Sequence, residues 1–297
     1  MQCPPHPLGG GIAQERRGES LELPDLRVVV AKPMRNERLR VSRLAFRAIS
    51  RPSSVAALDN ERSFESRTKA VQQFLGRIEP PLALEGARVL DVGSGYGALC
   101  FHLAENGAAR VVGMEVSPSL VEFTRSLLTG PCAHLADRVE FQLAADIDDL
   151  EEYDFDLIIS QDVLIYIPDL ERFTAALVKR LKPGGRLAIG MSPLWYSPWG
   201  GLIKHTTWLP WAHLIFPEEL FAERGHTFFG DSHMTVRRFL GAIRNSGLEE
   251  QYLAFNVVSR SGLLATVALA VMSALRTVPG VRDLLTFSLY GSWRKPA

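Results

Sequence analysis

The feature that most constrains the fold of this chain is a short apolar run followed at once by three closely spaced glycines. Residues 89–92 form the run, and Gly93, Gly95 and Gly97 follow it. A second apolar run, residues 111–114, ends at Glu115. Glycines let a ligand approach the backbone closely, and a carboxylate about 20 residues further on is placed to accept the two hydroxyls of a ribose. The pattern predicts a parallel α/β fold that binds a nucleoside-containing cofactor.

The spacing of the glycines distinguishes between cofactors. A dinucleotide loop has the pattern G-x-G-x-x-G, whereas this loop has G-x-G-x-G and carries Asp91 two residues before its first glycine. A carboxylate at that point repels a pyrophosphate and favours a ligand with a cationic amino group. The sequence therefore argues against a nicotinamide dinucleotide.

The segment from Asp91 to Gly97, together with Glu115, resembles the cofactor signature of class I S-adenosylmethionine-dependent methyltransferases. Further similar segments follow in the order of that family, at residues 145–147, 155–160 and 181–187, so that the resemblance covers roughly residues 64–191. It implies S-adenosylmethionine as the cofactor. It also implies contacts to the methionine end from Asp91, Gly93, Ser94, Gly95 and Gln161, to the ribose from Glu115, to the adenine amine from Asp146, and to the adenine ring faces from Val116 and Ile147. For Asp146, a helix cap is the alternative.

The order of apolar runs predicts a doubly wound, mostly parallel, seven-stranded Rossmann-like sheet with helices on both faces and lid insertions. Five strands are expected near residues 89–92, 110–115, 139–144, 155–160 and 186–191, a sixth near 253–258 and a seventh at 285–290. Ser63 is expected to cap the helix before the first strand, and Gly184 and Gly185 to end the helix before the fifth.

The chain is expected to divide into five parts. These are a disordered leader at 1–25, a helical or lid segment at 26–62, the cofactor-binding core at 63–191, an aromatic-rich lid at 192–232, and a return to the core at 233–297 that contains an apolar insertion at 259–283.

The aromatic insertion is the predicted acceptor site. It holds four of the five tryptophans, and we expect Trp195, Trp208 and Trp211 to enclose an apolar or planar acceptor together with Tyr166. The alternative is that these aromatics form a core of the insertion itself. His205 is the first candidate for a general base and His213 the second. Asp162 is open between a catalytic role and a helix cap, and no metal site is expected.

Composition limits the remaining choices. Lysine and arginine balance aspartate and glutamate at 33 each, so no global field favours nucleic acid or an anionic membrane. Three scattered cysteines indicate a reducing compartment, and we expect a cytoplasmic protein. Residues 261–275 carry no charge, but spanning a bilayer takes about 20 apolar residues. A buried or lid helix is therefore favoured, with peripheral membrane contact as the alternative.

Taken together, the sequence predicts a methyltransferase that acts on a small or medium organic acceptor, at oxygen before nitrogen or carbon, in natural-product or saccharide biosynthesis. One alternative is methylation of a lipid or quinone precursor at a membrane surface. An alternative of another class is a non-catalytic module that binds S-adenosylmethionine.

Overall fold

A computed structural model describes residues 36–52, 60–228, 233–256, 270–275, 277–278 and 281–297. Their centre is a seven-stranded sheet with the order β3-β2-β1-β4-β5-β7-β6. The strands are β1 (Arg88–Val92), β2 (Arg110–Glu115), β3 (Val139–Leu143), β4 (Phe155–Gln161), β5 (Leu181–Met191), β6 (Glu249–Phe255) and β7 (Leu289–Arg294). The first five are parallel, and β7 runs antiparallel to both of its neighbours. This confirms the predicted mostly parallel, Rossmann-like sheet.

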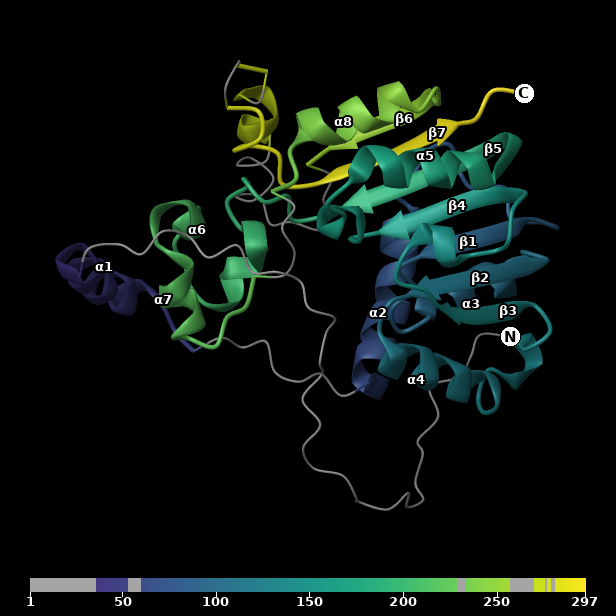
Figure 1. Ribbon diagram of the computed structural model, residues 1–297, viewed down its shortest axis with the longest axis horizontal. Coiled ribbons are helices and arrows are strands. Elements are labelled where there is room, and N and C mark those ends of the chain that lie inside the picture. Colours follow the sequence, from purple (N-terminus) through teal and green to yellow (C-terminus); the bar gives the residue numbers. More distant parts are fainter. Residues whose placement is uncertain (1–35, 53–59, 229–232, 257–269, 276, 279–280) are drawn as a thin grey trace.

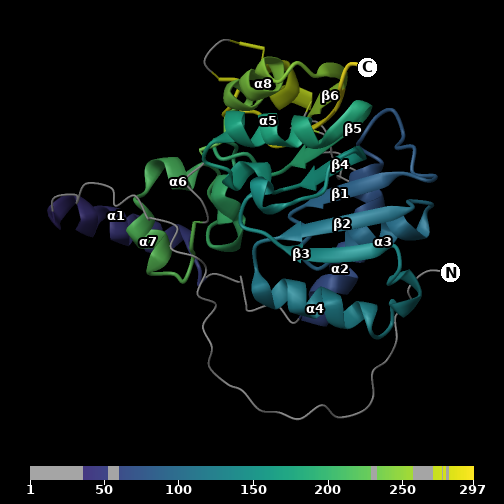
Figure 2. The same ribbon diagram turned by 45° about the vertical axis from the view of Figure 1, so that its right-hand side comes forward.

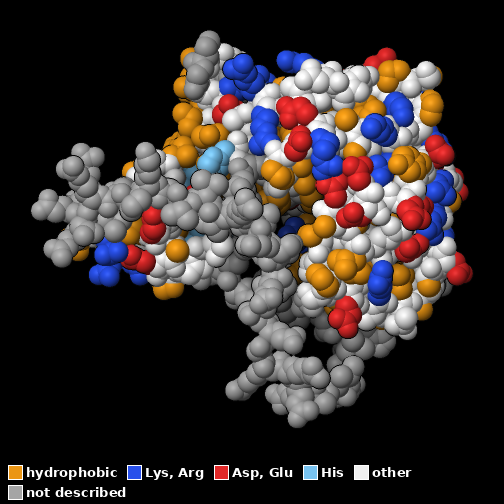
Figure 3. Space-filling model, in the orientation of Figure 1, with side chains coloured by type: hydrophobic (Ala, Val, Ile, Leu, Met, Phe, Trp, Pro, Cys, Tyr) orange, Lys and Arg blue, Asp and Glu red, His pale blue; other side chains and the backbone are white. Residues whose placement is uncertain are grey.

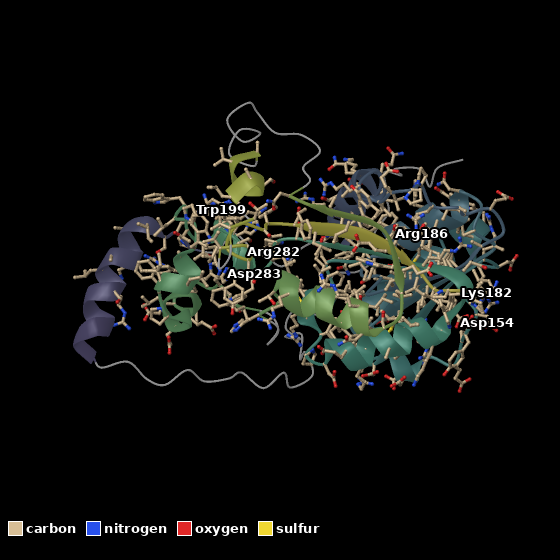
Figure 4. All side chains as sticks on the ribbon, turned by 90° about the horizontal axis from the view of Figure 1, so that it is seen from above. Asp154, Lys182, Arg186, Trp199, Arg282 and Asp283 are labelled. Atoms are coloured by element: carbon tan, nitrogen blue, oxygen red, sulfur yellow. The ribbon has the colours of Figure 1, made fainter. Side chains whose placement is uncertain are left out.

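Helices cover the sheet on both faces. Neighbouring residues of the central strands point to opposite sides of the sheet, and each side forms a core with its own set of helices. Leu90 and Ile158 belong to a core shared with α5 (Leu170–Arg180) and α8 (Val236–Asn245). Val89 and Leu157 belong to a second core, shared with α2 (Asn60–Leu75), α3 (Ala98–Glu105) and α4 (Pro118–Leu128). Seen from above, α5 and α8 lie on the side of the sheet opposite to α2 and α3 (Figure 4).

A separate aromatic lobe, made of residues 36–52 and 192–228, stands beyond the carboxyl ends of the parallel strands (Figures 1 and 2). It contains α1 (Asn36–Ile49), η4 (Gly200–His205), α6 (Ala212–Ile215) and α7 (Glu218–Ala222). Its own core is formed by Phe46 of α1 with Ile203, Ala212, Leu220 and Phe221, against which Trp199, Phe216 and Phe228 pack. Much of the aromatic content of the insertion is therefore internal to the lobe, as the alternative interpretation held.

The two segments of the lobe, residues 36–52 and 192–228, are joined by an ion pair and a backbone hydrogen bond. Arg43 of α1 forms a salt bridge of 2.6 Å with Glu223, just after α7, and Arg51 N donates to Thr206 O at 2.8 Å. The expected helical or lid segment at 26–62 thus contributes α1 to this lobe and the start of α2 to the sheet. Residues 1–25, expected as a leader, lie outside the described residues.

Several expected boundaries are wrong for local reasons. β7 begins at Leu289 and not at 285, because a turn covers residues 281–285. The residues after the turn are engaged elsewhere, since Thr286 Oγ1 donates to Arg282 O and Phe287 N donates to Asn256 Oδ1. β6 begins at Glu249 and not near 253, since an edge strand with an exposed face needs no apolar alternation.

Two predicted helix ends, one before the first strand and one before the fifth, are also wrong. Ser63 lies inside α2, which begins at Asn60, so it is not the cap of that helix. α5 ends at Arg180, and Gly184 and Gly185 lie within β5, where a register shift follows the pairing of Leu181 with Phe155.

Of the apolar segment at 261–275, the structure describes residues 270–275, which are helical. Within the described parts of the chain, no helix has the length and apolar character needed to cross a membrane.

Candidate cofactor and active site

A cavity of about 450 Å³ lies between the sheet and the aromatic lobe. In the sheet, β2 and β3 lie on one side of β1, and β4 and β5 lie on its other side. The direction in which the chain adds strands therefore reverses between β1 and β4. Open α/β sheets bind ligands at this point. The sheet side of the cavity comes from the loops after β1 and β4, and the lobe side from Trp195, Gly201 and Leu202.

The glycine loop forms one wall of the cavity. Gly93 N and Ser94 N both donate to Met114 O, at 2.8 and 2.9 Å, which fixes the loop against β2. Gly93 has a φ of +75°, and a Cβ there would lie 2.2 Å from a methyl group of Val163. Gly95 has a φ of +53°, and a Cβ there would meet no atom within 4 Å. The second glycine therefore leaves open space on the cavity side, where a ligand can approach the backbone.

Asp91 places a buried carboxyl group in the same wall. The side chain is 2% exposed, and Cys100 Sγ donates to its Oδ2 at 3.2 Å. Burial raises the pKa of Asp91 to about 7, the hydrogen bond from Cys100 opposes that shift, and the nearby Glu115 adds to it. A buried carboxylate without a cation is costly, so this site fits a ligand that brings a cationic amino group. Ser94 Oγ, which also lines the cavity, is buried and has no hydrogen-bond partner among the described residues.

Glu115 lies at the end of β2 and contacts the cavity wall through a hydrogen bond to Gly95, which lines the cavity. Its Oε2 accepts from Gly95 N at 2.8 Å, and its Oε1 accepts from Val116 N and Ser117 N, both at 2.9 Å. The carboxylate therefore holds the second glycine of the loop in place. Its predicted contact with a ribose stays a prediction.

The three residues predicted around the adenine do not line this cavity. Asp146 caps the short η2 helix (Ile147–Asp149) by accepting from Asp148 N, and it pairs with Arg172. The hydrogen bond from Arg172 is the main cause that lowers the pKa of Asp146, and the bond from Asp148 N adds to it. Ile147 is fully buried in the core, and Val116 is 44% exposed. The cap that the sequence allowed for Asp146 is present, and the adenine contacts stay predictions.

The end of β4 and the loop after it supply the opposite wall, with Gln161, Asp162, Val163 and Tyr166 lining the cavity. Asp162 adopts a left-handed φ of +59°, and its Oδ1 accepts from Ser192 N at 2.7 Å. Burial raises the pKa of Asp162 to about 6, against the opposing effects of that hydrogen bond and of Arg67. Non-glycine residues held in this backbone region concentrate at functional sites. Asp162 is thus a titratable group in direct contact with the cavity.

The predicted bases and aromatics divide into two groups. Tyr166 and Trp195 line the cavity, whereas Trp208, Trp211, His205 and His213 do not. Trp208 is 69% exposed, on the outside of the lobe. Trp211 Nε1 donates to Leu284 O at 3.2 Å. His213 is buried behind Trp195, with its Nε2 2.6 Å from Trp195 O, and this burial lowers its pKa.

Sequence reasoning missed several lining residues, among them Arg67 of α2, Tyr96 and Leu202. Arg67 carried no recognisable signal, because its position depends on how α2 packs beside the glycine loop. Asp162, by contrast, was considered from the sequence, since polar residues that directly follow a central parallel strand lie at the ligand-binding edge.

The comparison with known families adds to this geometry. Residues 90–187 match the sequence model of the family described as "Methyltransferase domain". The chain carries a class I methyltransferase domain. The matched residues begin within β1 and end within β5, so this methyltransferase domain includes the glycine loop, Glu115 and the loop after β4. S-adenosylmethionine is the cofactor of such domains, and the open space at Gly95 and the buried Asp91 fit its amino acid portion.

Curated relatives share parts of the methyltransferase domain. A phosphoethanolamine N-methyltransferase of Triticum aestivum is 37% identical over 106 residues, which is 35% of this chain and 20% of that protein. A ubiquinone biosynthesis O-methyltransferase of Nitrobacter winogradskyi is 32% identical over 163 residues, 52% of this chain and 60% of that one. The chain thus spans less than two thirds of the length of these relatives.

Among solved structures, an S-adenosylmethionine-dependent methyltransferase of Mesorhizobium loti has the same fold. Its TM-score is 0.50 at 23% identity, with 78% of this chain and all of that chain covered.

Proposed function

We propose that the protein transfers a methyl group from S-adenosylmethionine to a small organic acceptor bound between the loop after β4 and the aromatic lobe. The observation that carries this proposal is the buried Asp91 carboxyl group in the wall of a cavity that also contains the open backbone of Gly95. In this arrangement Asp91, Ser94 and Gly95 hold the methionine end of the cofactor. Gln161, the last residue of β4, lines the same cavity and orients the same end of the cofactor.

The acceptor has the other half of the cavity. Tyr166, Ile165, Trp195 and Leu202 give that half an apolar and aromatic lining, which suits an acceptor with planar or aliphatic surface. Acidic and basic side chains are interspersed on the described surface visible in Figure 3, so no single-sign field of the kind that attracts a nucleic acid backbone covers that face.

The sulfonium of the bound cofactor supplies an activated methyl carbon. The protein contributes alignment of the acceptor with the carbon–sulfur bond, which accounts for a large part of the acceleration in such displacements. Transfer of this methyl group to the acceptor oxygen would leave the electron pair of the carbon–sulfur bond on sulfur. The acceptor hydroxyl releases its proton to Asp162, which we place ahead of His205 and His213 as the general base because it lines the cavity. Oxygen is the expected acceptor atom, with nitrogen or carbon next.

A direct test uses binding and turnover together. Calorimetry with S-adenosylhomocysteine and with NAD should show binding of the first ligand only. Methyl transfer from S-adenosylmethionine should then be measured by mass spectrometry over a panel of phenols, carboxylic acids and amines. Binding without transfer to any member would favour the non-catalytic module, and binding of NAD alone would refute the cofactor assignment.

The base is tested by comparing two variants. Asp162→Asn keeps an oxygen that can accept from Ser192 N but cannot take a proton, so kcat should fall by about 10²–10⁴ with cofactor affinity unchanged. In the parent protein, turnover should fall as the pH drops below about 6, where Asp162 becomes protonated. His205→Ala should leave both quantities nearly unchanged. The reverse result would restore His205 as the base.

A further inference from the structure

A second hollow, which shares no lining residue with the cofactor cavity, lies between α8 and the turn before β7. It has a volume of about 270 Å³ and is lined by Arg237, Leu240, Arg244, Arg282 and Asp283. Figure 4 shows Arg282 and Asp283 together, between α8 and the short helix at residues 270–275. We call these five residues the arginine groove.

The arginine groove has an excess of positive charge. Its one carboxylate is already engaged, because Asp283 Oδ1 accepts from Val236 N at the start of α8, at 2.7 Å. The guanidinium of Arg282 lies 5.4 Å from the ring centre of Phe255. Within the described ranges, none of the three arginines takes part in an ion pair. Guanidinium groups bind phosphate oxygens in a bidentate manner, so the groove is complementary to phosphate groups.

An apolar face accompanies this charge. On the helix at 270–275, Val271 and Leu275 are 51% and 49% exposed, and Val278 just beyond is 48% exposed. Val271 and Leu275 are four residues apart and share one side of that helix. Ser273 accepts a hydrogen bond of 3.3 Å from Asn256 Nδ2, which attaches the helix to the end of β6. Among the described residues, these aliphatic side chains are thus left about half exposed to solvent.

We propose that the arginine groove and the aliphatic side chains of Val271, Leu275 and Val278 form one docking surface for an anionic lipid bilayer. Short amphipathic elements bind at the membrane interface by inserting aliphatic side chains while basic groups pair with lipid phosphates. Aliphatic residues beside arginines fit this partner better than a nucleic acid, whose bases stack on aromatic side chains. The proposal does not depend on the methyl-transfer reaction.

Vesicle co-sedimentation of the full chain tests the proposal. Vesicles that contain phosphatidylglycerol should bind the protein, and vesicles of phosphatidylcholine alone should bind it much more weakly. Arg237→Gln with Arg244→Gln should weaken binding to anionic vesicles about 25-fold, on the basis of about 1 kcal/mol, or fivefold, for each basic side chain at such a surface. Leu275→Ser should weaken it further, and thermal unfolding should confirm that each variant is folded.

The matched control is Lys69→Gln with Lys179→Gln, which removes the same charge from exposed positions on α2 and α5, outside the groove. Equal loss in the two double variants would overturn the proposal, because it would indicate a general charge effect. Equal binding to both kinds of vesicle, or no binding to either, would overturn it too. So would binding to single-stranded nucleic acid that the groove variants abolish while vesicles remain unbound.

Discussion

Asp91 makes cofactor binding depend on pH in a way that can be calculated. Its pKa is about 7 in the free protein, and a cationic amino group beside it favours the ionised form. Ligand binding should therefore release a proton wherever Asp91 is protonated beforehand. With that pKa, binding should release about 0.9 proton at pH 6 and about 0.1 at pH 8, and the apparent affinity at pH 6 should be about tenfold below its limit at high pH.

The assay is titration calorimetry with S-adenosylhomocysteine, in pairs of buffers that differ in ionisation enthalpy. Asp91→Asn should weaken binding and abolish the proton release. Cys100→Ala should move the dependence to higher pH, because Cys100 donates the hydrogen bond that lowers the pKa of Asp91. Asp156→Asn is the matched control, since Asp156 pairs with Lys182 at the opposite end of β4. Proton release that is absent in the parent, or unchanged in Asp91→Asn, would refute the assignment.

The same group affects stability without a ligand. The pKa of Asp91 is higher in the fold than in the unfolded chain, so the fold binds the proton more tightly. The contribution of Asp91 to the free energy of unfolding should therefore decline as the pH rises from about 4 to about 7 and stay level above that range.

Further predictions concern the glycine loop. Glu115→Ala should weaken cofactor binding about 100-fold or more, since two hydrogen bonds to a charged group contribute roughly 1.5–3 kcal/mol each. Glu122→Ala, on the exposed side of α4, should leave binding unchanged. Calorimetry measures both affinities, and a change under about threefold in a folded Glu115→Ala protein would contradict the ribose contact. Gly93→Ala should lower the midpoint of thermal unfolding because its Cβ meets Val163 at 2.2 Å, and Val163→Ala in the same chain should restore part of the loss. Gly95→Ala meets no neighbouring atom but places alanine at a φ of +53°, so it should lose some stability, less than Gly93→Ala, and should lose ligand binding. An unfolding midpoint as low as that of Gly93→Ala would contradict this difference.

The sheet and the glycine loop were predictable because their signals are local. Residues 110–115 were expected as a strand and form β2 without any change of boundary. A buried parallel strand is mostly apolar along its length, and a loop that turns back on itself needs glycine, so both leave a signal in consecutive residues.

The lobe and the acceptor site were less predictable because they depend on contacts between remote residues. The composition of the insertion indicated an aromatic site, but it did not distinguish Trp195, which lines the cavity, from Trp208, which lies on the outside. The chain also bends at Gly201 and Leu202, where φ is positive at both residues, and both residues line the cavity. No periodic pattern encodes such a bend.

The pairing of α1 with the insertion has a consequence for the order of folding. Arg43 and Glu223 are 180 residues apart in the chain, and the entropy lost on closing a loop grows with its length. Most of the residues between them belong to the sheet and its helices. Once the sheet has formed, bringing the two halves of the aromatic lobe together costs little further chain entropy. The lobe should then form last and open first, as a cooperative unit with less protection against hydrogen exchange than the strands. One wall of the cavity belongs to this lobe. The entry and release of ligands should therefore need only local opening of the lobe while the glycine loop stays folded.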